Sequence, residues 1–487
     1  MTAVQEAQQQ PHDAEHESTP EARLGRELAA GAFAGVTELD LANRGLASLP
    51  AALCTGLPGL TKLNMAGNAL TTLPPEFERL TSLRTAFFLG NGFTTVPEVL
   101  GRLPALFMLS FKSCQLHDVP EASLAPSLGW LILTDNQLTA LPASLGRLSH
   151  LRKLMLASNQ LTTLPDMSGC VALELVRLSD NRLDAVPPGL LALPRLAWVA
   201  LAGNHLQPRH RDAPLDLPPR LADTAAWPDV TLGRQLGDGA SGTVYEAMHG
   251  QAQRAVAVKV YKPASSDGRV VDEVAAAIAL AHEDTDQHPN LIQTHGFIQR
   301  DDAAPALVME LLDPAMELLG RTPSFASVTR DVYPARERAF PLRYVVAVAR
   351  GVAAAVAHMH ARGLIHGDVY AHNILVDAAE LPSTTQSTAP PCWRVKLADL
   401  GAAFFFHSES NADSPDNAAA HLLKRVESRA LGCLLEELIE RCAAAEASQE
   451  ASTLAALCRL RDACLDYNVG QRPEASELVV ALDKLIF

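Results

Sequence analysis

An acidic residue and an amide residue, Asp368 and Asn373, stand five positions apart between two apolar runs. A carboxylate that accepts a proton, followed closely by an oxygen ligand for a metal, is what a phosphoryl-transfer site requires. A second acid, Asp399, follows 26 positions after Asn373, and Lys259 lies far upstream. We therefore predict that these four side chains meet around the phosphates of a nucleotide.

A glycine-rich turn lies upstream of Lys259, between two predicted strands at 229–236 and 243–247. A third predicted strand, 255–260, carries Lys259 itself. Because a strand rather than a helix follows the turn, the pattern argues against a Rossmann dinucleotide site. Glycines in such a hairpin let the backbone approach phosphates, whose oxygens the lysine can reach. The glycines of the turn are Gly237, Gly239 and Gly242.

Taken in this order, the motifs resemble those of the eukaryotic-type protein kinase family over residues 228–487. The resemblance implies a bilobal α+β domain, ATP and Mg²⁺ as cofactors, and phosphate transfer to a protein hydroxyl, with the serine/threonine type favoured. It implies Asp368 as catalytic base, Lys259 paired with Glu273, and Asn373 and Asp399 as magnesium ligands. Asp272 competes with Glu273 for its role. The other nucleotide-binding residues implied are Leu236, Gly237, Gly239, Gly242, Val244, Ala257, Met309, Glu310, Leu312 and Leu375.

Several positions depart from the family pattern. Gly367 replaces the arginine of H-R-D, and Tyr370 stands where serine/threonine kinases usually have lysine, a role for which His372 is a substitute. No A-P-E motif follows Gly401, and Glu427 replaces the aspartate of a later helix. These departures leave open a catalytically weak pseudokinase scaffold. The His-Gly-Asp motif also resembles that of small-molecule phosphotransferases, such as aminoglycoside and choline kinases, which is a third alternative.

The first half of the chain contains an internal repeat with the pattern Leu-x-x-Leu-x-Leu-x-x-Asn. Its asparagine slot falls at positions 68, 91, 114, 136, 159, 181 and 204, with Cys114 replacing asparagine once and Arg44 filling the slot of an irregular first unit. One such unit cannot bury its own apolar face, so the units must stack. The pattern resembles a leucine-rich repeat array and predicts an α/β solenoid over 23–206, including an N-terminal cap.

The positions that flank the central core residue of each repeat strand are expected to face the concave side of the solenoid. Half of them are large and apolar, more than a monomer usually exposes. One interpretation is a docking surface for a protein substrate or regulator, and the other is that the kinase-like half covers it. We call these residues the concave stripe; they are Phe87, Met108, Trp130, Ile132, Met155, Leu175 and Trp198.

Composition bounds the remaining possibilities. A net charge of −15 argues against a nucleic-acid partner. The N-terminus has no secretory signal, no run reaches about 18 consecutive apolar residues, and the eight cysteines form no C-x-x-C pair, which indicates reduced thiols. We therefore expect a cytoplasmic protein without a membrane partner. Besides the two domains, we expect a disordered segment at 1–22 and a proline-rich linker at 207–227.

Overall fold

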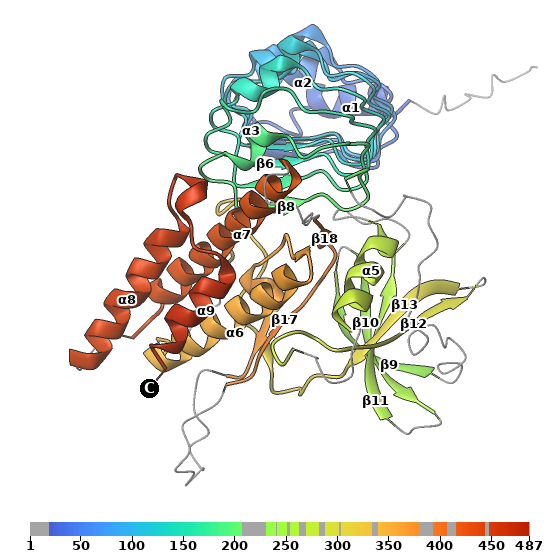
Figure 1. The fold of residues 1–487 in the computed structure, drawn as a ribbon. Coiled ribbons are helices and arrows are strands. Elements are labelled where there is room, and N and C mark those ends of the chain that lie inside the picture. Colours follow the sequence, from blue (N-terminus) through green and yellow to red (C-terminus); the bar gives the residue numbers. More distant parts are fainter. Residues whose placement is uncertain are drawn as a thin grey trace, which may run out of the picture.

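The computed structural model describes residues 19–206, 230–239, 241–250, 254–262, 269–281, 288–300, 303–333, 339–378, 393–406, 415–443 and 448–486. The expected linker at 207–227 and residues 1–18 of the expected disordered segment lie outside these ranges. Both predicted folds are present: a repeat solenoid is followed by a bilobal domain with an antiparallel sheet and a helical lobe (Figure 1).

The solenoid contains an eight-stranded parallel sheet in which every strand pairs with the next in sequence. Helix α1 (Pro20–Ala29) covers its first repeat, and short helical turns form the opposite side of every later repeat except the one between β6 and β7. The strands are β1 (Glu38–Asp40), β2 (Lys62–Asn64), β3 (Thr85–Phe87), β4 (Met108–Ser110), β5 (Trp130–Ile132), β6 (Lys153–Met155), β7 (Leu175–Arg177) and β8 (Trp198–Ala200). The turns are α2 (Ala51–Gly56), η1 (Pro75–Arg79), η2 (Glu98–Arg102), η3 (Glu121–Ser123), η4 (Ala143–Arg147) and α3 (Pro188–Leu191).

The asparagine slots form a buried ladder between repeats. Asn91, for example, donates from Nδ2 to the Met65 and Phe88 carbonyls at 2.9 and 2.8 Å and accepts from the Leu70 N–H. Backbone groups in the turns are thereby satisfied without water, as burial requires. Cys114 keeps part of this pattern, because its Sγ lies 3.3 Å from the Phe88 carbonyl.

The smaller lobe of the second domain is a five-stranded antiparallel sheet in the order β12-β13-β11-β10-β9, with helix α5 packed against it. Side chains of β11 alternate between the two faces of the sheet, because strand side chains have a period of two. Val256 and Val258 belong to a buried cluster on one face, and Tyr261 belongs with Val274 and Ile278 of α5 to a second cluster on the other. The elements are β9 (Val230–Asp238), β10 (Gly242–His249), β11 (Arg254–Tyr261), α5 (Val270–Leu280), β12 (Thr294–Arg300) and β13 (Ala303–Glu310).

The larger lobe is built around helix α6 (Leu342–Ala361). This helix is long and apolar enough to cross a membrane by length and composition alone, but 72% of its most apolar window is buried inside the fold. The other helices are α7 (Pro415–Glu440), α8 (Ser448–Cys464), η7 (Val469–Gln471) and α9 (Ala475–Asp483). The short elements near the lobe junction are β14 (Glu317–Leu318), β15 (Leu364–Ile365), η6 (Ala371–Asn373), β16 (Ile374–Val376), β17 (Val395–Leu397) and β18 (Phe404–Phe405).

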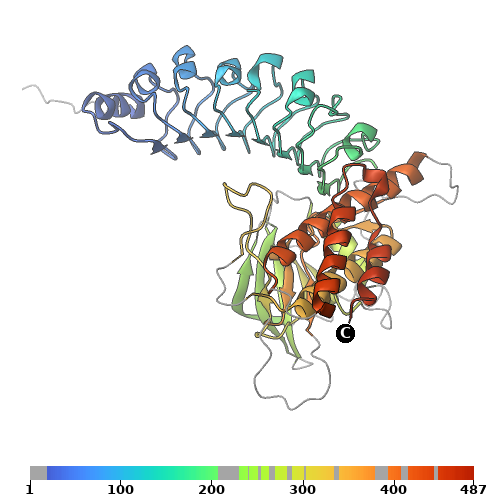
Figure 2. The same ribbon diagram turned by 90° about the vertical axis from the view of Figure 1, so that its left-hand side faces the viewer.

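The C-terminal end of the solenoid packs directly on the larger lobe (Figure 2). Leu175 and Trp198 of the solenoid belong to the apolar core of that lobe, and each is 2% exposed. In return, Phe404, Leu423 and Val426 of the lobe join the core of the solenoid. The two domains therefore share continuous apolar cores rather than meeting at a thin polar contact.

Buried arginines of the larger lobe add polar anchors to the same interface. The Arg472 guanidinium donates to the Pro194 and Leu196 carbonyls at 2.8 and 3.3 Å, and its side chain is fully buried. Arg429 donates from Nε to the Arg195 carbonyl at 3.1 Å. Burial lowers the pKa of Arg472 to about 10, which leaves it charged at neutral pH. These bonds fix the last repeat on α7 and on the turn before α9.

Candidate active site

The sheet of the smaller lobe presents Lys259 on the face that packs against helix α5, opposite the cluster that contains Val256 and Val258. Ala257 and Lys259 are two positions apart in β11, so their side chains share one face. In the antiparallel register, Val244 of β10 lies opposite Lys259, and Met309 of β13 lies opposite Ala257. Directly opposed residues share a face, so four of the predicted nucleotide-binding residues lie together on one surface of the sheet.

Lys259 joins helix α5 to the segment that follows β17. Its Nζ lies 2.5 Å from Glu273 Oε1 and 3.3 Å from Asp399 Oδ1. Asp272, the competing acid, is instead paired with Arg269 at 2.9 Å. Helical geometry explains the choice, because adjacent residues point about 100° apart and Glu273 faces the sheet.

The charges of this cluster shift its pKa values. Burial alone would lower the pKa of Lys259, but the carboxylates of Asp399 and Glu273 raise it above the ordinary value. Burial would raise the pKa of Asp399, but the Lys259 charge and the Gly401 N–H outweigh it and hold the pKa below its usual range. The Asp399 side chain is still 43% exposed. The site thus contains an ionised, accessible carboxylate beside a fixed cation.

The loop of residues 366–373, here called the catalytic loop, places Asp368 and Asn373 in contact. Asn373 donates from Nδ2 to the backbone carbonyl and to Oδ2 of Asp368, both at 3.0 Å. Since the amide nitrogen is used in these bonds, the amide oxygen is the atom left for a metal ligand. The His366 ring nitrogen Nε2 lies 3.1 Å from the Ala398 carbonyl, next to Asp399. The loop and the Asp399 segment are therefore held side by side.

Glu427 of α7 anchors the same loop through its backbone. Its carboxylate accepts from the Gly367 N–H at 2.6 Å and from the His366 N–H at 3.3 Å, and lies 2.7 Å from the His360 ring. Burial would raise the pKa of Glu427, but these partners lower it below its usual value. The substitution of glutamate for the family's aspartate thus retains a buried carboxylate under the loop.

The glycine turn connects β9 and β10 at the edge of this site. A Cβ atom on Gly237 would meet nothing within 4 Å, whereas one on Gly242 would lie 2.6 Å from the Val260 carbonyl oxygen. Gly239 donates its N–H to the Gly242 carbonyl at 2.9 Å, which closes the hairpin. The turn thus combines close packing at its base with open space along the segment that precedes its tip.

The remaining predicted nucleotide-binding residues lie in both lobes. Leu236 of β9 is 42% exposed, and Leu312 follows β13 as a half-buried residue. Glu310, at the end of β13, uses its side chain in an ion pair with Lys396 of β17 at 2.5 Å. Leu375 is a half-buried residue of β16 in the larger lobe. These four positions contribute apolar and backbone groups from both lobes.

The solenoid reaches this site through its last two strands. Trp198 of β8 stacks on Tyr370, with ring centroids 4.3 Å apart, and donates from Nε1 to the Val369 carbonyl at 3.0 Å. Arg177 of β7 donates to the Gly367 carbonyl at 3.0 Å and forms an ion pair with Asp368. The interpretation that the kinase-like half covers the concave stripe therefore holds at its C-terminal end.

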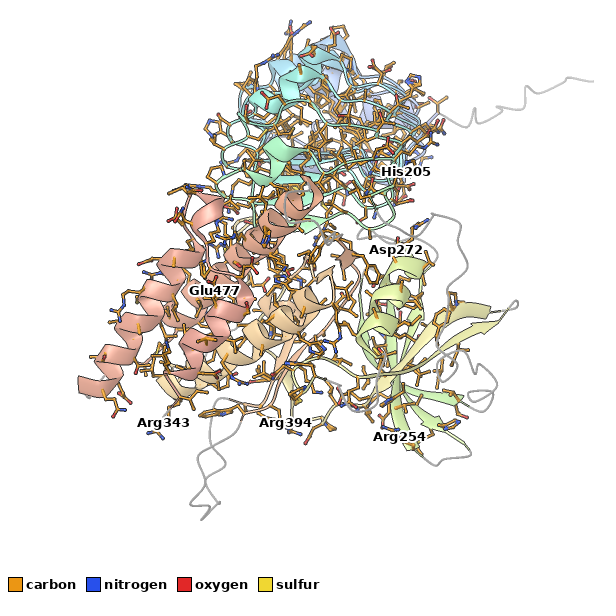
Figure 3. All side chains as sticks on the ribbon, in the orientation of Figure 1. His205, Arg254, Asp272, Arg343, Arg394 and Glu477 are labelled. Atoms are coloured by element: carbon orange, nitrogen blue, oxygen red, sulfur yellow. The ribbon has the colours of Figure 1, made fainter. Side chains whose placement is uncertain are left out.

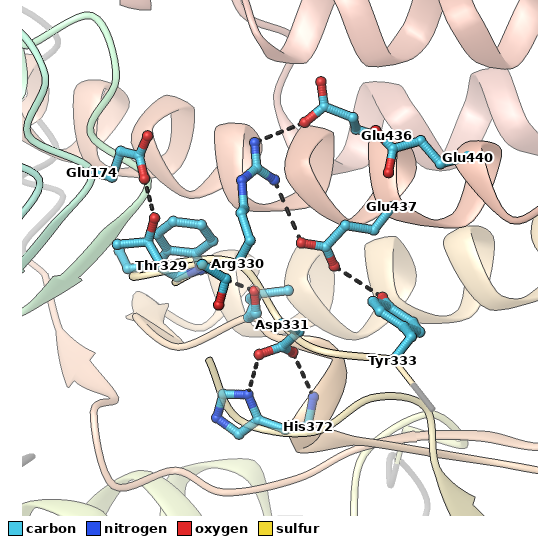
Figure 4. A network of polar contacts seen from close by, with 12 residues as sticks. Glu174, Thr329, Arg330, Asp331, Tyr333, His372, Glu436, Glu437 and Glu440 are labelled. Carbon is cyan, nitrogen blue, oxygen red and sulfur yellow. Dashed lines mark hydrogen bonds and ion pairs between the residues drawn. The ribbon is translucent and has the colours of Figure 1, made fainter. Parts of the chain in front are cut away.

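A loop of the larger lobe, residues 321–333, also contacts the solenoid. Phe325 lies 6.1 Å from the rings of both Phe87 and Trp130, yet remains 61% exposed. The Thr329 hydroxyl donates to Glu174, as Figure 4 shows. The second domain therefore contacts the concave stripe at Phe87 and Trp130 as well as at its C-terminal end, and the buried members of the stripe are Met108, Leu175 and Trp198.

The same loop binds His372 through Asp331. Its Nδ1 lies 2.7 Å from Asp331 Oδ1, and its backbone N–H donates to Asp331 Oδ2 (Figure 4). Burial would lower the pKa of His372, but Asp331 raises it above the ordinary value. The expectation that His372 substitutes for the missing lysine beside Asp368 is not favoured, because its ring is held by Asp331.

The solenoid also meets the start of α5. A Cβ atom on Gly203, which has φ of +74°, would lie 3.0 Å from Asp272 Oδ2 and 2.9 Å from Arg269 Nε. Figure 3 labels Asp272 at the end of α5 that faces the solenoid. One end of the array thus touches both the helix that carries Glu273 and the loop that carries Asp368.

Sequence reasoning missed Arg177 as a member of this site. Arg177 flanks the central core residue of its repeat strand, but it is charged, and the concave stripe was defined by its large apolar residues. Its alternating position in β7 does predict that it faces the concave side. Nothing in the repeat pattern indicates which residue of the second domain it meets.

Family models match both halves of the chain. A protein kinase domain model matches residues 230–478, just over half of the chain, and leucine-rich repeat models match residues 59–80 and 126–183. A leucine-rich repeat protein of Leptospira interrogans aligns with 27% identity and a TM-score of 0.31, over 36% of this chain and 51% of that one.

The curated relatives include serine/threonine-protein kinases. The serine/threonine-protein kinase PknF of Mycobacterium tuberculosis is 31% identical over 188 residues, which is 38% of this chain and 34% of PknF. The probable serine/threonine-protein kinase kinY of Dictyostelium discoideum is 25% identical over 32% of this chain and 26% of that protein. The chain thus spans about a third or less of the length of these relatives. The family model covers more than half of the chain, and the pairing of Lys259 with Glu273 and of Asp368 with Asn373 agrees with it. The chain therefore belongs to the protein kinase family and carries leucine-rich repeats before its kinase domain.

Proposed function

We propose that this chain is an ATP-dependent protein kinase of the serine/threonine type. The observation that carries the proposal is that Lys259 lies 2.5 Å from Glu273 and 3.3 Å from Asp399 while Asn373 is bonded to Asp368. These five side chains, from distant parts of the sequence, support the arrangement that phosphoryl transfer requires. The named relatives support the serine/threonine type.

In the proposed reaction, the substrate hydroxyl attacks the γ-phosphorus of ATP, and the bond to the bridging oxygen of ADP breaks. Asp368 orients the hydroxyl and accepts its proton, which then passes to solvent. Lys259, held by Glu273, binds phosphate oxygens. This arrangement supplies orientation and charge stabilisation rather than covalent chemistry.

The donor set fits a magnesium ion. Carboxylate and amide oxygens are the protein ligands that Mg²⁺ prefers. Asp399 provides an ionised and accessible carboxylate, and the amide oxygen of Asn373 is left free of the bonds that its nitrogen makes. When bound there, the ion would neutralise phosphate charge, and these two residues would hold it.

The nucleotide base would lie between the two lobes. Leu236, Val244, Ala257 and Leu375 provide apolar side chains from both lobes. The backbone at the end of β13 provides hydrogen-bonding groups through Met309, Glu310 and Leu312, and the turn with Gly237, Gly239 and Gly242 would cover the phosphates.

We further propose that the array recruits a protein substrate or regulator in the cytoplasm. Phe87, Trp130, Ile132 and Met155 of the concave stripe are only half-buried. Met108, Leu175 and Trp198 are buried, so the partner surface is confined to the less covered residues. The seven cysteines in the described part of the chain are all free thiols, which supports a reducing compartment.

The proposal is tested by transfer of labelled γ-phosphate from ATP to protein substrates and to the chain itself. Asp399→Asn should reduce transfer by at least about 100-fold, because the residue loses a metal ligand and its charge. Asp462→Asn is the matched control, since Asp462 lies on α8 and its side chain is 66% exposed. Transfer that Asp399→Asn leaves unchanged would contradict the proposal. Turnover on amino-sugars or alcohols, but on no protein, would instead indicate a small-molecule kinase.

A further inference from the structure

Arg177 is a residue of the repeat array that contacts the proposed catalytic base. Its Nη1 donates to the Gly367 carbonyl at 3.0 Å, and its Nη2 is bonded to Asp368 Oδ1. The Arg177 side chain is 4% exposed and that of Asp368 is 15% exposed. The guanidinium thus holds the carboxylate and the backbone of the loop at the same time.

The docking of the array keeps this contact in place. Trp198 is buried against Tyr370, and the fully buried Arg472 donates to carbonyls of the last repeat. Separating the two domains would expose the shared apolar cores and remove two carbonyl acceptors from the Arg472 guanidinium, which is unfavourable. The docking of the two domains therefore keeps the Arg177 side chain beside Asp368.

The ion pair leaves Asp368 able to accept a further hydrogen bond. An ionised carboxylate has about four acceptor sites on its two oxygens. Arg177 uses one on Oδ1 and Asn373 uses one on Oδ2. The two bonds fix the plane of the carboxylate, and the partly exposed remainder is available to an incoming hydroxyl.

The catalytic loop itself lacks a cation that could do this. Gly367 has no side chain, Tyr370 is stacked beneath Trp198, and His372 is held by Asp331. Lys259 is engaged with Glu273 and Asp399. The cation beside the Asp368 carboxylate is therefore Arg177 of the array and not a residue of the catalytic loop.

We propose that Arg177 is a positioning residue of the kinase site, contributed by the repeat array, which orients the Asp368 carboxylate toward the substrate hydroxyl. This inference rests on the proposed kinase activity. It makes the array a structural component of the active site in addition to a surface that recruits partners. If Arg177 instead blocked Asp368, removing its side chain would raise kcat rather than lower it.

The test compares the full-length chain with Arg177→Ala and Arg177→Lys, measuring phosphate transfer and Mg·ATP affinity for each. Because catalysis depends steeply on orientation, kcat of Arg177→Ala should fall roughly 10- to 100-fold, while Mg·ATP affinity stays within about twofold. Arg177→Lys should retain part of the activity, since it keeps the charge but loses the two-pronged geometry. Added guanidinium at low concentration should partly restore kcat of Arg177→Ala in a saturable manner.

Arg182→Ala is the matched control, because Arg182 is an exposed arginine of the same repeat, and it should behave as wild type. Unchanged Mg·ATP affinity shows that the variant is folded. If wild type is active and Arg177→Ala is equally active or faster, the inference fails while the proposed function stands. If wild type binds Mg·ATP and transfers phosphate to no protein, the proposed function itself fails and the inference falls with it.

Discussion

Gly367 lies where the backbone of the array closely approaches the catalytic loop, so Gly367→Ala tests the docking directly. Its φ is +74°, and an added Cβ would lie 2.5 Å from the Val199 carbonyl oxygen and 2.8 Å from that of Ala402. The left-handed conformation costs a non-glycine residue about 1–2 kcal/mol. Overlap with two carbonyl oxygens in a packed interface adds about 1–3 kcal/mol. We therefore expect Gly367→Ala to lower the free energy of unfolding by roughly 2–5 kcal/mol.

Gly363 provides the matched control. It has nearly the same φ, +70°, but the nearest atom to an added Cβ is the Phe406 carbonyl oxygen at 3.3 Å. Gly363→Ala should therefore lose only the conformational part, about 1–2 kcal/mol. The difference between the two variants isolates the contribution of close packing around Gly367, including its contact with the array.

The measurement is denaturant unfolding of the full-length chain, combined with hydrogen exchange at β8 and in residues 366–373. In Gly367→Ala, amides on both sides of the contact should lose protection together, because the same steric overlap displaces both. Equal losses of stability in the two alanine variants, with β8 protected as in wild type, would refute the close approach of Val199 to Gly367.

Three further predictions concern the core and the buried charges. Trp198→Ala should lower the free energy of unfolding by about 3–5 kcal/mol, since it removes a fully buried aromatic side chain, and denaturant titration would measure this; a loss below about 1 kcal/mol would contradict the packing. Glu427 has a lowered pKa in the fold, so its contribution to stability is present above its usual value of 4.5 and is lost as the pH falls through the folded-state pKa. The stability difference between wild type and Glu427→Gln should accordingly shrink at acid pH, and a difference that grows there would reverse the sign of the argument. Cys114→Asn should raise stability by about 0.5–1.5 kcal/mol by restoring an amide donor to the Phe88 carbonyl, and calorimetry showing a lower Tm would oppose this expectation.

The sequence predicts the two folds well because each has a local signature. The recurring leucines and asparagines specify strands and turns at every repeat, and the ladder in which Asn91 takes part follows from that period. The four residues Lys259, Asp368, Asn373 and Asp399 could be named because motif spacing identifies them separately. Their placement in one site then follows from the kinase-like topology.

Contacts between the domains could not be predicted in the same way. The repeat pattern places Arg177 and Trp198 on the concave side, but no periodicity links them to Gly367 or Tyr370. The glycine in His-Gly-Asp could be noticed as a departure, and its physical reason emerges only from the nearby Val199 carbonyl and the positive φ. Such positions are determined by tertiary packing between segments about 170 to 190 residues apart.

Burial of Arg472 beneath the last repeat constrains how this gene can change over evolutionary time. Adding or deleting a unit next to α3 would remove the Pro194 and Leu196 carbonyls from a buried positive charge, and selection should eliminate such variants. At the far end, β1 pairs with β2 and with no other strand of the described residues, so a stacked unit there interacts with one described neighbour. Duplication and loss among descendants should therefore accumulate at the amino-terminal units and spare the carboxy-terminal ones.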